Sequence, residues 1–487
     1  MRDRLPAALA SLSGLLLLLF YWQVPIGEDG LFWWVPKALL VAETGPSFVL
    51  DVLPQAARPN ATLPPQWAGG LPDYGHPPGW YWYLGSFLTL PIKTHHALRL
   101  AVLSLIVLFG IGSAKLLARI GGQRAAWGAM VLPWVPPIAA QFLRADTDLP
   151  LLALTPWALV AILDRRDGLF ALTAGLATFC KEPGILLAAP ALAACILDKR
   201  RGWGWAVPPL VLAGWAALHY SQTGWALAGS ERLPDSLMGW LSDLGAVLWI
   251  TLGSQGRWLF VLPAAWMIYR HGRHRHRALA VLGVHIAVQL LFFGTVNFLG
   301  GIERIDSHTH VRYLIPAILG ACAIVIAARV ELALVLLPVN LLYLHQASPY
   351  GPEASLYGAD VQRAVAKAAP EISALGPPVW VGSYAWTQLT RPYAGTTSTP
   401  MDQLSVYGYH TDPGVVDGYV VEVCEGEPMG RIQERKRVLV STTTVKSAWV
   451  KIWHIEQTDE QTGIPAQAQP LRLDPPKLMT PSGSSHL

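Results

Sequence analysis

Residues 5–27 read LPAALASLSGLLLLLFYWQVPIG, an apolar stretch without a single charged residue. A helix needs roughly 20 apolar residues to cross a bilayer, so this stretch is long enough to span one. Similar stretches recur up to about residue 346, and most charged residues lie between them. The sequence therefore predicts an α-helical polytopic membrane protein with about 10 to 11 transmembrane helices.

The composition excludes most other classes of protein. Of the 487 residues, 52% are hydrophobic and only 14% are charged, which is too little charge to coat a soluble protein of this length. The net charge of +4 comes from short basic clusters between apolar stretches. Such clusters are typical of orientation signals and do not indicate a nucleic-acid partner.

The basic clusters also predict the orientation of the chain in the membrane. Arg2 and Arg4 place the N-terminus in the cytoplasm, and the cluster at 270–277 marks a cytoplasmic turn. The stretches 25–80 and 221–256 and the C-terminus then lie outside. We expect a multi-pass protein of a bacterial inner (plasma) membrane.

Apolar segments give the expected positions of the helices. After the first helix they are 98–117, 125–142, 168–180, 184–197, 204–220, 278–297, 311–328 and 330–346. The segment Gly79–Pro91 is too short to span, and the orientation leaves no crossing for it. We interpret it as a helix in the outer interface, and a short crossing beside a misassigned neighbour is the alternative.

The composition changes after residue 346. We predict a membrane-embedded domain over 1–346, in which 25–97 is a first external loop with juxtamembrane helices. Period-two patterns at 379–382, 418–423 and 437–440 predict strands, and 359–369 reads as a helix. Residues 347–465 therefore form a small external α/β domain, and the Pro- and Ser-rich tail 466–487 is predicted to be disordered.

Two groups of polar residues lie near the first helix on the predicted external face. Glu28 and Asp29 emerge together beside aromatic residues. Partial desolvation there would raise a carboxylate pKa toward the range of a general base, and a solvated acid pair at a helix end is the alternative. Asp73 and His76 precede Pro77-Pro78, which fixes the backbone before the aromatic run GWYWY.

Further charged residues occur later in the chain, and most of them fall on the same face. Arg144 and Asp148 flank a predicted external helix end, Lys181 interrupts two short apolar segments, and Arg312-Tyr313 precedes another. Intramembrane ionisable residues are candidates for function by default.

A histidine-containing loop raises the question of a metal. Glu303, His308 and His310 could ligate zinc or manganese, although the sequence favours a polar loop, and no divalent metal is required.

The shared face suggests one kind of chemistry. A carboxylate base, arginine and lysine side chains and an apolar surface would suit transfer from a lipid phosphate, because Arg and Lys can neutralise a departing phosphate.

The order of these motifs resembles a known family, the glycosyltransferases of the C superfamily. The chain is similar to protein O-mannosyltransferases and lipid A aminoarabinose transferases over roughly residues 5–346. The resemblance is carried by the acidic pair Glu28-Asp29, His76-Pro77-Pro78, Arg99-Leu100, Asp148-Leu149-Pro150, Lys181 and Arg312-Tyr313-Leu314-Ile315-Pro316.

The resemblance implies a cell-envelope enzyme with a periplasmic active site. It would move a hexose or pentose from a polyprenyl-phosphate sugar to a hydroxyl of a lipid, glycan or protein acceptor, with inversion. Asp29 or Glu28 would be the base, and the family usually has Asp before Glu, the reverse of this chain. Donor binding would fall to His76, Lys181, Arg312, Tyr313 and Arg144, with support from Asp148 and Asp73.

Two other classes of protein remain as alternatives. A secondary transporter would carry charges near the bilayer midplane and often two related halves, and no convincing repeat is evident here. A membrane scaffold for envelope glycan assembly would leave the ordered motifs without a role.

Overall fold

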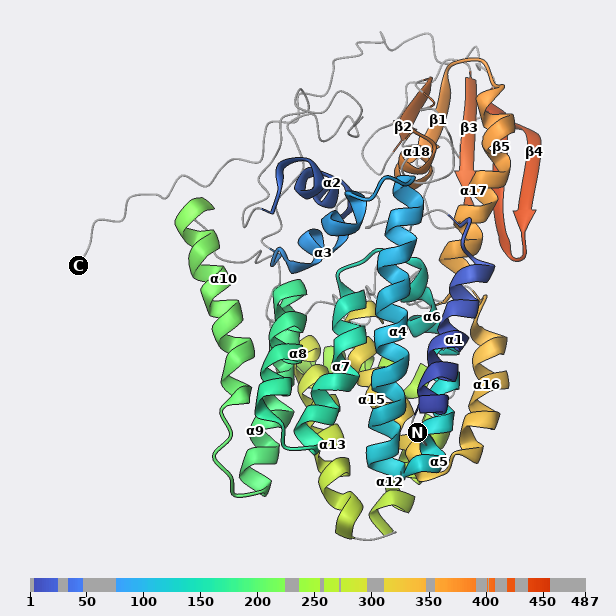
Figure 1. The fold of residues 1–487 in the computed structure, drawn as a ribbon. Helices are drawn as coiled ribbons and strands as arrows, with labels where there is room; N and C mark the ends of the chain where they lie inside the picture. The colour runs from blue at the N-terminus through green and yellow to red at the C-terminus, as the bar shows by residue number, and fades with distance from the viewer. Residues whose placement is uncertain are drawn as a thin grey trace. The chain divides into compact units, whose positions relative to one another are not determined.

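The computed structural model describes most of the chain and is mainly helical (Figure 1). The described residues are 4–24, 34–46, 76–223, 236–254, 258–270, 273–295, 311–346, 355–390, 401, 403–407, 418–424 and 437–455. The chain divides into two compact units. One comprises residues 1–50, 74–363 and 445–448, and the other comprises 51–73, 364–444 and 449–487.

Several helices of the first unit are long and apolar enough to cross a membrane. They are α4 (Thr94–Gly121), Arg277–Thr295 of α13 (Arg273–Thr295), and Val311–Ala328, which joins η10 (Val311–Leu314) to α15 (Ile315–Ala328). A bent pair raises this number of candidates in the described chain from 3 to 4. The protein is thus a multi-pass membrane protein, as predicted.

Shorter apolar helices coincide with several of the other predicted segments, although the helices over 148–163 and 237–253 were not among the segments given from the sequence. The shorter helices are α1 (Arg4–Phe20), α7 (Asp148–Leu163), α8 (Asp167–Cys180), η5 with α9 (Glu182–Leu187 and Ala188–Leu197), α11 with η7 (Leu237–Leu248 and Trp249–Gly253) and α16 (Glu331–Tyr343). Because each is shorter than an ordinary spanning helix, the number of 10 to 11 crossings stays a prediction.

The predicted helix 125–142 is the main departure from the sequence interpretation. It is divided into α5 (Gln123–Ala126), η4 (Trp127–Trp134) and α6 (Pro136–Leu143), with a bend of 63°. Proline lacks an amide hydrogen and disfavours helical geometry in the residue before it. Val135, which precedes Pro136-Pro137, is accordingly extended, with ψ 121°.

Two short helices lie at the N-terminal end of α4 (Figure 1). They are α2 (Val35–Thr44) and α3 (Gly79–Leu88), and α3 agrees with the short helix predicted over 79–91. Two further helices, α10 (Val207–Thr223) and α12 (Trp258–Arg270), complete the described helical part of this unit, apart from the one-turn η6 (Gly204–Ala206) and the start of α17.

Close packing fixes the centre of the first unit. The helix α4 packs against α1 and against α7 (Figure 1). A side chain at Gly110 would meet the backbone of Ser11 at 2.6 Å, so the small residue lets α1 and α4 approach closely. Every residue of α15 except Ala328 is buried, which makes α15 a central helix and fixes the segment just before it.

The second unit contains a five-stranded sheet in the order β2-β1-β3-β5-β4. The strands are β1 (Val379–Gly382), β2 (Leu404–Tyr407), β3 (Gly418–Val423), β4 (Arg437–Val445) and β5 (Ala448–Ile455). β1 pairs parallel with β2 and β3, and β3 pairs antiparallel with β5. Together with α17 (Tyr357–Ser373) and α18 (Ser383–Thr390), this confirms a small C-terminal α/β fold.

Candidate functional site

Polar residues gather at the two ends of the same helices. Asp148 begins α7 and Asp164 follows its last residue, whereas Asp167 begins α8 and Lys181 follows its last residue. A helix of 16 residues is about 24 Å long, so these charges form two separate groups. The group that contains Asp148 and Lys181 also contains Arg312, and it is the candidate functional site.

A break in the chain brings Lys181 to this site. Its backbone is extended, with φ −156° and ψ 130°, and Pro183 prevents α8 from continuing. The break packs directly on the start of α3, because a side chain at Gly79 would meet Phe179 at 2.6 Å. Lys181 is thereby buried, with only 2% of its surface exposed.

Two cations meet at one aromatic ring. The Lys181 Nζ lies 5.3 Å from the centroid of the Tyr313 ring, and the Arg312 guanidinium lies 5.1 Å from it. Arg312 Nη2 also donates to the Tyr313 hydroxyl at 3.3 Å. Trp34 borders the same place, with its ring 5.9 Å from the Lys181 Nζ. The arrangement stabilises two buried positive charges by cation–π contacts.

Acidic residues connect these cations to Arg144. Arg312 Nε lies 3.6 Å from Asp148, and Nη1 lies 3.9 Å from Asp146. Arg144 Nε donates to Asp146 at 2.8 Å. Among the described residues, the carboxylate of Asp148 has no hydrogen-bond partner although the residue is only 3% exposed. Its position at the start of α7 offsets part of the cost of burial, since a helix N-terminus favours negative charge.

His76 joins the site through Glu182. The Nδ1 of His76 and the Oε1 of Glu182 are 2.6 Å apart, and about one fifth of each side chain is exposed. The Trp34 ring contacts His76 edge-on at 5.2 Å. Burial lowers the pKa of His76 below its ordinary value of 6.5, and Lys181 and Lys37 lower it further, whereas Glu182 opposes the change.

Lys37 is a member of the site that the sequence analysis missed. It lies in α2, is 2% exposed, and its Nζ is 5.3 Å from the centroid of the Tyr81 ring. The ring centroids of Tyr81 and Trp34 are 6.0 Å apart, and Lys181 contacts the Trp34 ring. Lys37 and Lys181 therefore flank one aromatic cluster, which is formed by Tyr81 and Trp34. A lysine inside the apolar run VPKALLVA is the signal that could have revealed it.

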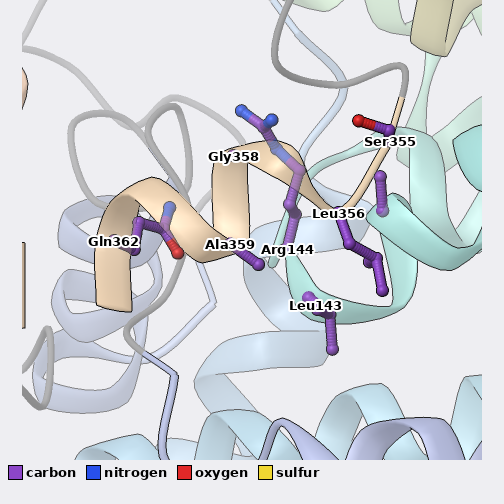
Figure 2. Close-up of a pocket in the computed structure, with 8 residues that line it drawn as sticks. Leu143, Arg144, Ser355, Leu356, Gly358, Ala359 and Gln362 are labelled. Carbon is purple, nitrogen blue, oxygen red and sulfur yellow. The ribbon is translucent and has the colours of Figure 1, made fainter. Parts of the chain in front are cut away.

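A small pocket borders the site at Arg144. It is partly open to solvent, and it is lined by Ala140, Leu143, Arg144, Ser355, Leu356, Gly358, Ala359 and Gln362. Figure 2 shows Leu143 and Arg144 beside the first turn of α17. The floor is mostly apolar, and Arg144 supplies its charge.

The remaining predicted site residues lie outside the described part of the chain. They are Glu28, Asp29, Asp73, Glu303, His308 and His310. The base and the metal ligands suggested by the sequence therefore stay predictions. Within the described residues, no group of three or more His, Cys, Asp or Glu side chains could hold a metal ion.

The opposite group of charges has a structural arrangement. Asp198, at the end of α9, accepts from Arg277 Nη2 at 2.8 Å and from Arg165 Nη2 at 3.1 Å. Arg277 also donates to the carbonyl oxygens of Ile162 and Leu163. These contacts join the ends of α7, α9 and α13 and leave the other end of the bundle for function.

Comparison with known protein families supports the sequence resemblance. Residues 75–222 match the family described as dolichyl-phosphate-mannose-protein mannosyltransferase. The matched stretch contains His76, Arg144, Asp148 and Lys181. No curated protein sequence matches the chain at a significant level.

Solved structures with the same fold extend the likeness over nearly the whole chain. ArnT from Cupriavidus metallidurans bound to undecaprenyl phosphate superposes with a TM-score of 0.52 at 14% identity, covering 91% of this chain and 97% of that chain. ArnT from the same organism in the apo state gives 0.50 at 15% identity, with the same coverage. The family match and the fold thus agree with the predicted resemblance to membrane glycosyltransferases of the C superfamily.

Proposed function

We propose that this protein is a membrane glycosyltransferase that moves a sugar from a polyprenyl-phosphate donor to an acceptor hydroxyl. The observation that carries the proposal is the pair of buried cations, Lys181 and Arg312, over the ring of Tyr313. Buried cations at a water-accessible helix end suit an anionic phosphate. Lys181 lies in the stretch 75–222 that matches the mannosyltransferase family, and Arg312 lies in η10, just before α15.

The donor phosphate would lie between Lys181 and Arg312. Arg312 offers a planar fork of donors, which suits phosphate oxygens, and Lys181 offers a compact charge. Both cations already face the Tyr313 ring, and Arg312 also lies close to the Asp148 and Asp146 carboxylates, so the two cations are held in place before the donor arrives. Preorganised charges of this kind stabilise a leaving group without reorganisation during the reaction.

The transfer would take place in a single displacement. Asp29, with Glu28 as the alternative, accepts the proton of the acceptor hydroxyl, and the hydroxyl oxygen forms a bond to the anomeric carbon. The bond from that carbon to the phosphate oxygen breaks, and its electron pair leaves with the polyprenyl phosphate. One displacement inverts the anomeric centre. Protein cations neutralise the leaving phosphate in this step.

We place this reaction on the external, periplasmic face of a bacterial inner membrane. The basic clusters at 115–124 and 270–277 would be cytoplasmic, which puts the opposite helix ends outside. The acceptor would be a lipid, glycan or protein hydroxyl that approaches from that side.

The test compares membranes with the active gene, without it, and with Asp29→Asn or Glu28→Gln. Mass spectrometry of membrane lipids and surface glycans should show a polyprenyl-phosphate sugar that accumulates when the protein is absent. Loss of the base should lower turnover by about 10² to 10⁴-fold without preventing insertion. The matched control is Glu43→Gln, an exposed carboxylate on α2. Uptake of a solute coupled to an ion gradient, with no lipid-linked sugar consumed, would contradict the proposal and favour a transporter.

A further inference from the structure

The contact between His76 and Glu182 joins two segments that are 106 residues apart. One partner precedes α3 and the other begins η5, so neither local sequence nor a shared helix brings them together. Both side chains remain about one fifth exposed at the candidate site. A carboxylate that contacts Nδ1 of a histidine fixes the ring orientation and determines which nitrogen carries the proton.

The helix break gives Lys181 and Glu182 different partners. Lys181 turns to the ring of Tyr313, and Glu182 turns to His76. In the part of the chain that the structure describes, Glu182 pairs with His76 and forms no ion pair with its neighbour Lys181. The two adjacent residues therefore do not simply neutralise each other.

The surroundings of His76 disfavour a positive charge on its ring. Burial lowers its pKa, and Lys181 on one side and Lys37 on the other add repulsion. Glu182 is the carboxylate that counters these effects among the described residues. When a phosphate group enters beside Lys181, the paired carboxylate makes protonation of the ring easier than it would otherwise be.

We propose that Glu182 is a positioning residue for donor binding, because it holds the Nδ1 proton of His76 and so lets the protonated ring bind the donor phosphate through Nε2. This inference rests on the proposed function and deepens it by assigning a pair of residues to the phosphate. The protonated His76 ring thus becomes a third cation beside Lys181 and Arg312, and it forms only when the phosphate is bound.

The experiment is a double-mutant cycle on the purified full-length protein, with undecaprenyl phosphate as the probe. Its affinity is measured for the unmodified protein, Glu182→Gln, His76→Asn and the double variant. We expect Glu182→Gln to weaken binding about tenfold, the equivalent of one pKa unit on His76. In the His76→Asn background, Glu182→Gln should have little effect on the affinity, since the imidazole ring that Glu182 positions is absent. Glu331→Gln, an exposed carboxylate on α16, is the matched control.

The pH dependence gives a second readout. Affinity should rise as the pH falls through and below 6.5, because binding needs the protonated ring and its pKa in the free protein is lowered. Glu182→Gln should lower the pKa of His76 further, so the rise in affinity should move to lower pH. His76→Asn should keep only the change that comes from the titration of the lipid phosphate itself, which all four proteins share.

Each outcome has a defined meaning. Equal losses from Glu182→Gln in both backgrounds would overturn the role assigned to Glu182 and leave the proposed function intact. Failure of the unmodified protein to bind undecaprenyl phosphate would overturn both. The melting temperature of Glu182→Gln shows whether the variant is folded. Glu182→Asp keeps the negative charge, so it should recover part of the affinity that Glu182→Gln loses.

Discussion

At the residue scale, the site consists of charges that are expensive to bury. Lys37, Lys181 and Arg312 are each exposed by 6% or less. Removing such a charge from water costs several kcal/mol unless partners compensate it. Aromatic rings and the carboxylates of Asp146 and Asp148 supply part of that compensation. Because these three buried cations outnumber those two carboxylates, the excess of positive charge is suited to an anion.

Arg312→Gln should weaken undecaprenyl phosphate binding by about 10 to 100-fold, since a charged hydrogen bond contributes about 1.5–3 kcal/mol. Arg312→Lys should keep the charge but lose the two-pronged contact with the phosphate. Its affinity should therefore lie between that of the unmodified protein and that of Arg312→Gln. Binding is measured on purified protein, with the melting temperature as a check on folding. Arg329→Gln is the matched control, because Arg329 is exposed at the far end of the same helix. Equal effects of the two Gln variants would contradict a specific role for Arg312.

At the element scale, breaks between helices place the functional side chains. The break between α8 and η5 presents Lys181 and Glu182, and the bend after η4 leads through α6 to Arg144. Prolines cause both breaks, so their positions are encoded locally. What each break faces depends on how tightly the neighbouring helices approach.

Gly79→Ala tests this close approach. The added methyl group would meet the backbone carbonyl and ring of Phe179 at 2.6 Å, so α3 must move away from α8. We expect a loss of about 1–3 kcal/mol in stability, seen as a lower melting temperature in detergent, together with weaker binding of undecaprenyl phosphate.

Gly168→Ala is the matched control for that variant. Gly168 lies in the first turn of α8, and a methyl group there would meet nothing within 4 Å. Because alanine favours a helix over glycine, stability should stay equal or rise by up to about 1 kcal/mol. If Gly79→Ala behaved in the same way, the packing argument would be wrong.

At the scale of the whole molecule, the division of charge between two helix ends decides where the reaction can occur. The candidate site lies at one end of α7 and α8. The group of Asp198, Arg165 and Arg277, called here the Asp198 cluster, lies at the other end. The basic residues concentrate at the Asp198 end, which the positive-inside rule assigns to the cytoplasm.

Cysteine labelling tests this orientation in a variant without Cys180, Cys195, Cys322 and Cys424. Ile92→Cys lies at the site end, in the turn before α4, and Arg201→Cys lies near the Asp198 end; both positions are exposed. A membrane-impermeant maleimide should label position 92 in intact spheroplasts and position 201 only after lysis. The reverse pattern would place the site in the cytoplasm and exclude an external transfer reaction.

The sequence predicted the class of fold because hydrophobicity is a local property of the chain. The helices near α4, α8, α9, α13, α15 and α16, and the strands β1, β3 and β4, follow from apolar length and period-two alternation. The strands β2 and β5, the helices α7, α11 and α12 and the division of 125–142 were not among the predicted elements. Proline-rich apolar segments resemble continuous helices by composition, although each proline ends the regular hydrogen bonding.

The candidate site was predicted less completely than the fold. His76, Arg144, Asp148, Lys181, Arg312 and Tyr313 were singled out from the sequence, and the structure brings them to the same helix ends. Lys37 was missed because its charge is surrounded by apolar neighbours along the chain. The roles of Glu28, Asp29 and Asp73 stay predictions.

The sequence by itself determined that this chain is a helical membrane protein whose charges lie at helix ends, because burial of apolar length and the positions of prolines act locally. Only the tertiary structure decided which charges meet. Glu182 pairs with His76 and not with adjacent Lys181, and Lys37 flanks the same aromatic cluster as Lys181. Such contacts depend on the close approach of distant helices, which packing determines and no local pattern records.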